Sequence, residues 1–176
     1  FQKALRNGNI LSINGKGNTI WLARLGGSTS LTFENNQYTI RNYSSEDGLS
    51  SDFIYQVFTD SKDRTWFATD GKGVTMLDKS GFHQFDQGLS SRVVYSFAED
   101  IYKNIWITSQ DNGVYMFDQD KFVSVPEIRL RDNSIQSIAA DQFGNLIATH
   151  NYGIDVYDIK NKQMRYWGEE AGIRDK

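Results

Sequence analysis

The sequence contains no cysteine, which removes disulfide bonds and thiolate metal ligands from consideration. It has one proline and 15 glycines in 176 residues, so collagen-like and proline-rich disordered classes are excluded. No run approaches the roughly 18 apolar residues of a transmembrane helix. The 19 basic residues are scattered and the formal net charge is −3, which disfavours a nucleic-acid-binding protein. What remains is a folded domain whose 39% hydrophobic residues are enough to build a core.

A repeat organises what is present. The stretch that begins at Gly48 is followed, forty residues later, by a second version that begins at Gly88. Four further pairs of identical residues share this spacing: Asp60 and Asp100, Trp66 and Trp106, Gly73 and Gly113, and Asp78 and Asp118. Internal repeats of about 20–50 residues are typical of solenoids, propellers and arrays. No apolar stripe with helical spacing appears, which disfavours solenoids built from helices.

Each repeat is predicted to contain four short strands separated by polar turns. In the clearest repeat the strands are residues 53–58, 65–69, 74–77 and 82–85, which are rich in aromatic and β-branched residues. Aspartate and glycine occupy the turns between them. Four antiparallel strands per repeat make one propeller blade. The predicted fold is therefore all-β, an arc of about four four-stranded blades that forms part of a larger, seven-bladed type of propeller.

The repeats predict a division of the whole chain. The blades are residues 6–43, 44–86, 87–127 and 128–168, residues 1–5 resemble the last strand of a preceding blade, and residues 169–176 resemble the start of a further repeat. A ring that closed within this chain would need only one such overhang, so two overhangs predict an excised arc. We expect such an arc to expose apolar blade faces and to self-associate.

Trp21, Trp66 and Trp106 share one position in the second strand of their repeats, and the spacing of forty puts Leu146 at this position in the last repeat. Blade sheets are buried on both faces, so we interpret these residues as core packed between neighbouring blades. A sugar-stacking role would instead require the rings to be exposed in a groove.

Asp60, Asp100 and Asp141 close the first hairpin of three repeats, where an aspartate side chain can bond to nearby backbone amides. A calcium loop would need a denser run of oxygen ligands than these turns provide. His83 and His150 have no partnered histidine or cysteine for a metal site. We therefore predict structural turns, with no metal ion and no cofactor.

The repeats resemble the two-component regulator propeller family. The matching residues are Gly48-Leu49-Ser50, Asp60, Trp66-Phe67-Ala68-Thr69 and Gly73-Val74 in one repeat, and Gly88-Leu89-Ser90, Asp100, Ile105-Trp106-Ile107-Thr108 and Gly113-Val114 in the next. The resemblance covers residues 44–173 well and 6–43 weakly. Arg64 and Asn104 depart from it, because glycine is usual at their positions.

The resemblance implies a periplasmic sensor region of a hybrid two-component histidine kinase of Bacteroides-like bacteria. In that family the propellers precede a transmembrane helix, a kinase and a DNA-binding output domain, and the usual ligands are oligosaccharides. The propeller itself would be non-catalytic and would not contact nucleic acid, and the parent inner-membrane protein would be a homodimer. Two alternatives stay open: a carbohydrate-active lyase or glycosidase, which needs converging carboxylates or a Tyr or His base, and a propeller that only docks proteins.

Candidate ligand-binding residues lie on loops where the repeats differ. The loops at residues 47–52, 70–72, 91–92, 110–112, 129–133 and 150–152 belong to one face of a propeller, and binding residues concentrate on such loops. The candidates are Asp52, Asp70, Lys72, Arg92, Asp111, Asn112, Arg131, His150 and Tyr152. This mixture suits a polyhydroxy or anionic sugar, through carboxylate capture by arginine and stacking on tyrosine. The alternative is an ordinary solvated loop face.

Overall fold

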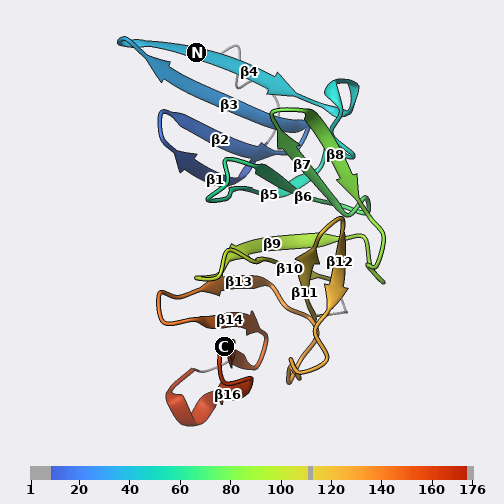
Figure 1. Cartoon of the computed structure of the whole chain (residues 1–176), viewed down its shortest axis with the longest axis vertical. Coiled ribbons are helices and arrows are strands. Elements are labelled where there is room, and N and C mark those ends of the chain that lie inside the picture. Colours follow the sequence, from blue (N-terminus) through green and yellow to red (C-terminus); the bar gives the residue numbers. More distant parts are fainter. Residues whose placement is uncertain (1–8, 111–112, 174–176) are drawn as a thin grey trace. The chain divides into compact units, whose positions relative to one another are not determined.

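The computed structural model describes residues 9–110 and 113–173. Within these residues the chain forms 16 strands in four antiparallel sheets of four strands each (Figure 1). In every sheet the strands pair in the order in which they follow along the chain. The all-β prediction with four-stranded blades is confirmed. The chain forms two compact units, residues 1–85 and residues 86–176, each with two sheets.

The strands have the following bounds. The first sheet contains β1 (Ile10–Lys16), β2 (Thr19–Arg24), β3 (Gly27–Glu34) and β4 (Gln37–Tyr43). The second contains β5 (Ile54–Thr59), β6 (Thr65–Thr69), β7 (Val74–Asp78) and β8 (Gly81–Phe85). The third contains β9 (Val94–Glu99), β10 (Ile105–Ser109), β11 (Gly113–Asp118) and β12 (Lys121–Ser124). The fourth contains β13 (Ser137–Ala140), β14 (Asn145–His150), β15 (Gly153–Asp158) and β16 (Gln163–Trp167). Two short 3-10 helices, η1 (Ser45–Asp47) and η2 (Glu169–Ala171), complete the elements.

In the unit of residues 1–85, an aromatic core packs the first sheet against the second. Trp21 and Tyr43 from the first sheet meet Val57 and Phe67 from the second. The Trp21 ring centroid lies 5.2 Å from that of Tyr43 and 5.5 Å from that of Phe67, which it meets edge to face. Edge-to-face and tilted aromatic pairs are favourable beyond the apolar area they bury. The interpretation of Trp21 as core between blades is confirmed.

In the unit of residues 86–176, a second core packs the third sheet against the fourth. Ala98 and Trp106 contribute from the third sheet, and Ile138, Leu146 and Ala148 contribute from the fourth. These side chains are at most 4% exposed. Buried β-sheet faces of this kind explain why the strands read as short apolar runs.

An aspartate closes the first hairpin of the second sheet. One carboxylate oxygen of Asp60 accepts hydrogen bonds from the backbone amides of Lys62 and Arg64, both at 2.9 Å. The other accepts from Arg64 Nε at 2.6 Å and from the indole Nε1 of Trp66 at 2.9 Å. We call this arrangement the hub of the sheet: the aspartate, the residue four positions later and, where present, the tryptophan six positions later.

The third and fourth sheets have hubs of the same kind. Asp100 accepts from Asn104 Nδ2 and Trp106 Nε1, both at 2.8 Å, and Asp141 accepts from Asn145 Nδ2 at 2.8 Å. In each case the backbone amide of the asparagine also donates to the aspartate. The turn role predicted for these aspartates is therefore confirmed. Asn104, which departs from the family pattern, supplies a hub donor.

The hub also corrects one prediction in the last sheet. Asn145 holds the position of Asn104, so the residue that corresponds to Trp106 is Ile147, two positions further on. Leu146 instead pairs with Ala140 and packs in the core. The prediction that Leu146 takes the tryptophan position is wrong, because Asp100 and Asp141 are 41 residues apart rather than forty.

Candidate functional site

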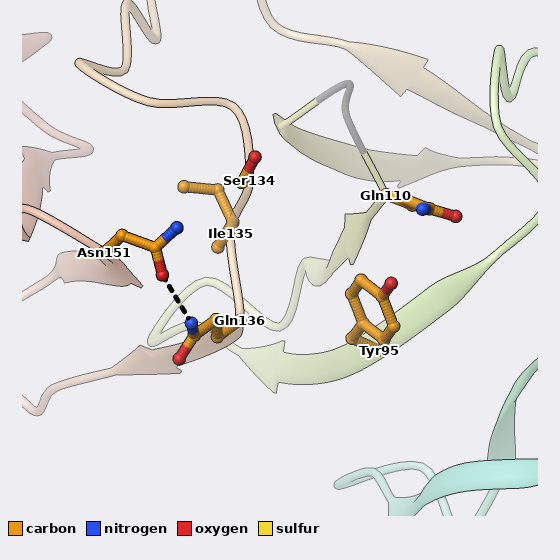
Figure 2. Close-up of a pocket in the computed structure, with 6 residues that line it drawn as sticks. All are labelled: Tyr95, Gln110, Ser134, Ile135, Gln136 and Asn151. Carbon is orange, nitrogen blue, oxygen red and sulfur yellow. Dashed lines mark hydrogen bonds between the residues drawn. The ribbon is translucent and has the colours of Figure 1, made fainter.

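A pocket of about 350 Å³ lies in the unit of residues 86–176. In the third sheet it is lined by the start of β9 and the turn after β10, and in the fourth by the residues at the start of β13 and the turn after β14. This end of each sheet is opposite to the end that carries the hub. Its lining residues are Tyr95, Gln110, Ser134, Ile135, Gln136 and Asn151 (Figure 2).

Backbone pairing holds the polar side chains of this pocket in place. The amide of Gln110 donates to the carbonyl of Val93 at 2.9 Å, which ties the end of β10 to the entry of β9. The amide of Gln136 donates to the carbonyl of Thr149, also at 2.9 Å. Gln136 Nε2 then donates to Asn151 Oδ1 at 2.8 Å (Figure 2). The amide side chains are therefore oriented by the ends of the strands.

The described lining is polar but carries no charged side chain. Two glutamines and an asparagine offer amide donors and acceptors, Ser134 adds a hydroxyl, and Tyr95 adds a phenol. Ile135 is 1% exposed and forms an apolar part of the wall. A few convergent polar groups around an apolar patch are typical of small-molecule sites. The arrangement can hydrogen-bond a neutral, polar ligand.

Three of the predicted residues meet in a cluster that we call the Tyr166 stack. The guanidinium carbon of Arg131 lies 3.7 Å from the ring centroid of Tyr166. The His150 ring stacks on Tyr166, with centroids 6.0 Å apart and an interplanar angle of 13°. The Tyr166 hydroxyl donates to the backbone carbonyl of Tyr152 at 2.7 Å. The structure therefore brings Arg131, His150 and Tyr152 together.

Within this stack His150 is a buried group. Its side chain is fully buried, and its Nδ1 accepts from the backbone amide of Tyr152 at 3.2 Å. Its Nε2 lies 3.4 Å from a carboxylate oxygen of Asp155, and the same oxygen accepts from the amide of Arg131 at 2.8 Å. Because Nδ1 is an acceptor, the neutral ring carries its proton on Nε2. Arg131 and Tyr152 are exposed, and they are the members of the stack that a ligand can reach.

Three other predicted residues lie in the unit of residues 1–85. The carboxylate of Asp52 accepts from the backbone amide of Ser45 at 2.6 Å and from its hydroxyl at 3.1 Å, so it organises its own loop. Asp70 and Lys72 are exposed in the turn between β6 and β7. Within the described residues their side chains make no hydrogen bond or ion pair.

The remaining predicted residues are Arg92, Asp111 and Asn112. Arg92 Nη2 lies 3.2 Å from Asp86 Oδ2, and both side chains are largely exposed. A pair of this kind at the surface is worth little. Arg92 does not line the pocket. Asp111 and Asn112 lie outside the described residues.

Sequence reasoning did not single out the residues that line the pocket. Gln110 and Asn151 fall within loops predicted to carry binding residues. Tyr95 repeats Tyr55 forty residues earlier and therefore reads as scaffold. Counting from the hub aspartates places Gln136 at the same strand position as Tyr95. This difference between repeats is a signal that could have been found by aligning on the hubs instead of on a spacing of forty.

Among residues 9–110 and 113–173, no group of three or more His, Asp or Glu side chains could hold a metal ion. No helix among them is long and apolar enough to cross a membrane.

No protein-family model matches the sequence, and no curated protein matches it. Solved structures do. The extracellular domain assigned to a hybrid two-component system of B. thetaiotaomicron matches with a TM-score of 0.80 and 21% identity, over 96% of this chain and 24% of that domain. A second domain of the same description and organism matches with a TM-score of 0.74 and 18% identity, over 97% of this chain and 26% of that domain.

Propeller enzymes match as well. A catalytically inactive virginiamycin B lyase from Staphylococcus aureus, solved with quinupristin, matches with a TM-score of 0.71 and 12% identity. The match covers 93% of this chain and 57% of the lyase. The chain therefore spans about a quarter of the length of the sensor domains and just over half of the lyase. At these identities the likeness shows a shared propeller fold, since fold alone does not fix function.

Proposed function

We propose that this chain belongs to an extracytoplasmic ligand-sensing propeller of a hybrid two-component system. It responds to oligosaccharides and has no catalysis of its own. The shared fold with two extracellular domains assigned to such systems supports this proposal. The repeat motifs around Gly48 and Gly88, which resemble the two-component regulator propellers, support it independently of the structure.

The observation that carries the ligand class is the uncharged pocket beside Gln136. A sugar hydroxyl both donates and accepts, and so do the amides of Gln136 and Asn151. The phenol of Tyr95 adds an aromatic surface with a polar tip. A volume of about 350 Å³ is within the range of small-molecule sites. These features favour a neutral sugar unit as the group bound there.

In the proposed signalling step, ligand favours one of two arrangements of the parent protein, which we expect to be a membrane-anchored homodimer. A ligand shifts such an equilibrium only by its difference in affinity for the two states. Loops at one end of a rigid sheet are suited to this, because their contacts can change while the strands stay in place.

The proposal is tested by binding of neutral oligosaccharides to the chain. We expect a neutral oligosaccharide to raise the melting temperature of the chain and to bind measurably in calorimetry. Gln136→Ala and Asn151→Ala should each weaken this binding about tenfold, because each removes hydrogen bonds to the sugar. Gln142→Ala is the matched control, since Gln142 is an exposed glutamine in the hub turn of the same sheet. A panel of neutral glycans that leaves the melting temperature unchanged would contradict the proposal and favour a protein-docking propeller.

A lyase is the second candidate, because a lyase propeller shares the fold. Incubation of the chain with uronic-acid oligosaccharides distinguishes the two functions. A sensor binds without turnover, whereas a lyase forms an unsaturated product that absorbs in the ultraviolet. Product formation that is lost in Tyr95→Phe would overturn the non-catalytic proposal.

A further inference from the structure

The first sheet lacks the hub aspartate that the other three sheets contain. In the hubs with a tryptophan, the aspartate lies two residues beyond the residue that pairs with the tryptophan in the strand ladder. In the first sheet Asn14 pairs with Trp21, so the hub position is Lys16. The sequence hides this substitution, because the turn between β1 and β2 is shorter than the other hub turns. A cation therefore stands where its counterparts are carboxylates.

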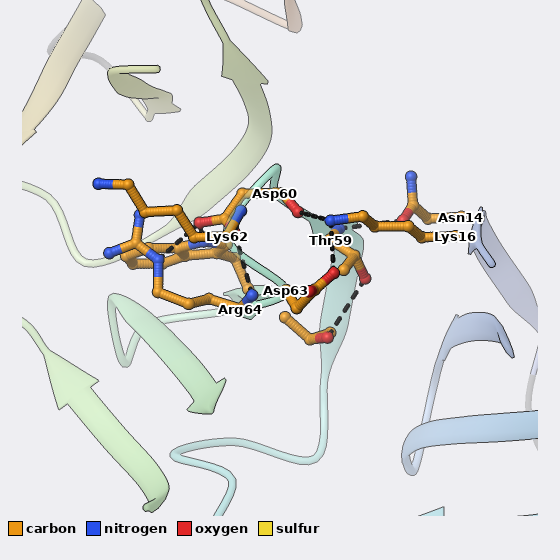
Figure 3. Close-up of polar contacts among 9 residues, drawn as sticks. Asn14, Lys16, Thr59, Asp60, Lys62, Asp63 and Arg64 are labelled. Atoms are coloured by element: carbon orange, nitrogen blue, oxygen red, sulfur yellow. Dashed lines mark hydrogen bonds and ion pairs between the residues drawn. The ribbon is translucent and has the colours of Figure 1, made fainter. Parts of the chain in front are cut away.

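Lys16 is held by the neighbouring hub hairpin. Its Nζ donates to the backbone carbonyl of Asp60 at 2.6 Å and pairs with Asp63 Oδ1 at 2.5 Å (Figure 3). An ammonium group has three N–H donors, so one remains beyond these two contacts. The pair is only partly shielded, since the Asp63 side chain is 75% exposed and solvent screens its charge.

The indole N–H of Trp21 has lost its usual acceptor. Trp66 and Trp106 donate to their hub aspartates at 2.9 Å and 2.8 Å. Trp21 is 8% exposed, and among the described residues its indole nitrogen has no hydrogen-bond partner. Trp21 lines an open pocket, and its indole nitrogen is not one of the enclosed polar atoms of the structure. This N–H is therefore available to donate to a group bound in the pocket.

Trp21 and Lys16 line a pocket of about 470 Å³ between the first and second sheets. Hydroxyl groups form much of its remaining wall. Thr19 and Thr32 are hydrogen-bonded to each other at 3.1 Å and line this pocket. Such a pair uses one of its two hydroxyl protons, so the other is left to donate. Ser30 adds a further hydroxyl. Asp63 also lines the pocket and is already paired with Lys16, so the donors left for a ligand are the indole N–H of Trp21, the third N–H of Lys16 and the hydroxyls.

We propose that this pocket binds a small carboxylate ligand whose carboxylate takes the place of the missing hub aspartate. The carboxylate accepts from the indole N–H of Trp21, from the remaining N–H of Lys16 and from the threonine hydroxyls. Hydrogen bonds between charged donors and carboxylates are the strong ones. This site lies in the unit of residues 1–85 and does not depend on the pocket beside Gln136.

The indole N–H signals of the four tryptophans provide a direct test. The ¹⁵N-labelled chain is titrated with acetate, with glucuronate, with glucose as the neutral sugar, and with chloride at matched ionic strength. We expect acetate and glucuronate to shift the Trp21 indole signal in a saturable way, with those of Trp66 and Trp106 unchanged. Trp21→Phe assigns the signal. A Trp21 signal that responds to neither carboxylate, or that responds equally to glucose or chloride, overturns the proposal.

A pair of lysine variants separates the site from general charge. Lys16→Met should weaken acetate binding at least about fivefold, because it removes the charged donor. Lys62→Met is the control, since Lys62 is an exposed lysine that does not line this pocket. The Trp66 indole signal reports in each variant that the neighbouring hub is intact. Equal losses in the two variants would mean that only net charge matters, and would overturn the assigned site.

Discussion

At the scale of single residues, the hub aspartates do most to hold the hairpins. Asp100 is 3% exposed and accepts hydrogen bonds from two backbone amides, one side-chain amide and one indole. Hydrogen bonds to an ionised acceptor are stronger than those between neutral groups. One side chain thereby satisfies the donors of a turn that strand pairing leaves unpaired.

Asp100→Ala should therefore lower the free energy of unfolding by about 3 kcal/mol, because it leaves several buried donors without an acceptor. Urea denaturation followed by tryptophan fluorescence measures this. Asp120→Ala is the control: Asp120 is exposed in the turn after β11, and its loss should cost at most about 0.5 kcal/mol. Similar costs for both variants would show that the hub contributes little.

The hub of the last sheet makes stability depend on acid. The Asn145 side chain donates to Asp141 and holds the pKa of that carboxyl below its ordinary value of 3.8. A lowered carboxyl pKa adds stability that is present above the unfolded-state value and is lost as the pH falls through the folded-state value.

Asn145→Ala should raise the pKa of Asp141 toward its ordinary value. The variant should then be destabilised more at about pH 7 than at about pH 3, because pH 3 lies below the ordinary carboxyl pKa of 3.8 and the contribution fades below that value. Carboxyl NMR titration together with urea unfolding at both pH values measures the effect. The pKa of Asp78, which Ser80 lowers to about 2, is an internal reference that should not change. An equal loss of stability at both pH values would contradict the linkage.

The sequence predicted these aspartates as turn residues but not their bonds to the second strand. Whether Trp66 or Trp106 can donate to an aspartate six residues earlier depends on the ladder register, which local propensity does not specify. The substitution at Lys16 was hidden for the same reason. The shorter turn places the hub position five residues before Trp21 rather than six, so a search at the spacing of the other hubs misses it.

At the scale of elements, one glycine determines how closely two strands of the first sheet approach. Gly27 opens β3 with φ of 105°, and a Cβ placed there would overlap the backbone carbonyl oxygen of Tyr43 at the end of β4. Glycine is the residue that allows both the dihedral and the close approach. Gly71 has φ of 74° in the turn between β6 and β7, and a Cβ there meets nothing within 4 Å.

The two glycines make a matched pair of variants. Gly71→Ala should cost about 1–2 kcal/mol, the penalty of a left-handed dihedral alone. Gly27→Ala should cost about 2 kcal/mol more, because the pairing of β3 with β4 must also open. Thermal unfolding of the two variants gives the difference. If they were equally stable, the close approach to Tyr43 would be unimportant.

The bounds of a fully buried strand were predicted more accurately than those of a partly exposed one. Residues 65–69 were predicted as a strand and form β6 with those bounds, and every residue in it is buried. The first strand of the last repeat was predicted at residues 135–139, whereas β13 is Ser137–Ala140. Ile135 and Gln136 lie before that strand and line the pocket. The apolar Ile135 suggests that the strand begins there, whereas the regular pairing with β14 begins at Ser137 and is preceded by one further bond, from the Gln136 amide to the Thr149 carbonyl.

At the scale of the whole molecule, an apolar strip follows β1 at the edge of the first sheet. Ile10, Leu11 and Ile13 are 52%, 44% and 67% exposed. Contiguous exposed apolar side chains on an edge strand favour association with another chain. We therefore expect the chain to self-associate, and we expect Ile13→Lys to reduce this.

Sedimentation velocity over a range of concentrations measures the association. Phe143→Lys is the control, because Phe143 is an isolated exposed aromatic residue in a hub turn and is 78% exposed. A chain that stays monomeric at high concentration would contradict the expectation. Equal effects of the two lysine variants would point to overall charge rather than to the strip.

Only part of the candidate pocket could be predicted, because some of its residues come together only when the sheets pack. The sequence identified the loops that hold Gln110 and Asn151, since repeats differ there. It did not identify Tyr95 and Gln136, which join those loops only when the third sheet packs against the fourth. Charged loop residues attract attention in a sequence, whereas this pocket is lined by neutral ones.

The hubs have a consequence for how such chains diversify. Every partner of Asp60 or Asp100 in its hub lies within six residues of it, so a duplicated gene segment carries its own complete closure with it. The opposite end of the sheet takes no part in that closure. Copies can therefore exchange or lengthen the loops around Gln110 and Asn151 while the hairpins still form. The first sheet has Lys16 at the hub position and lacks this closure, so the pocket beside Lys16 is free to serve ligand recognition.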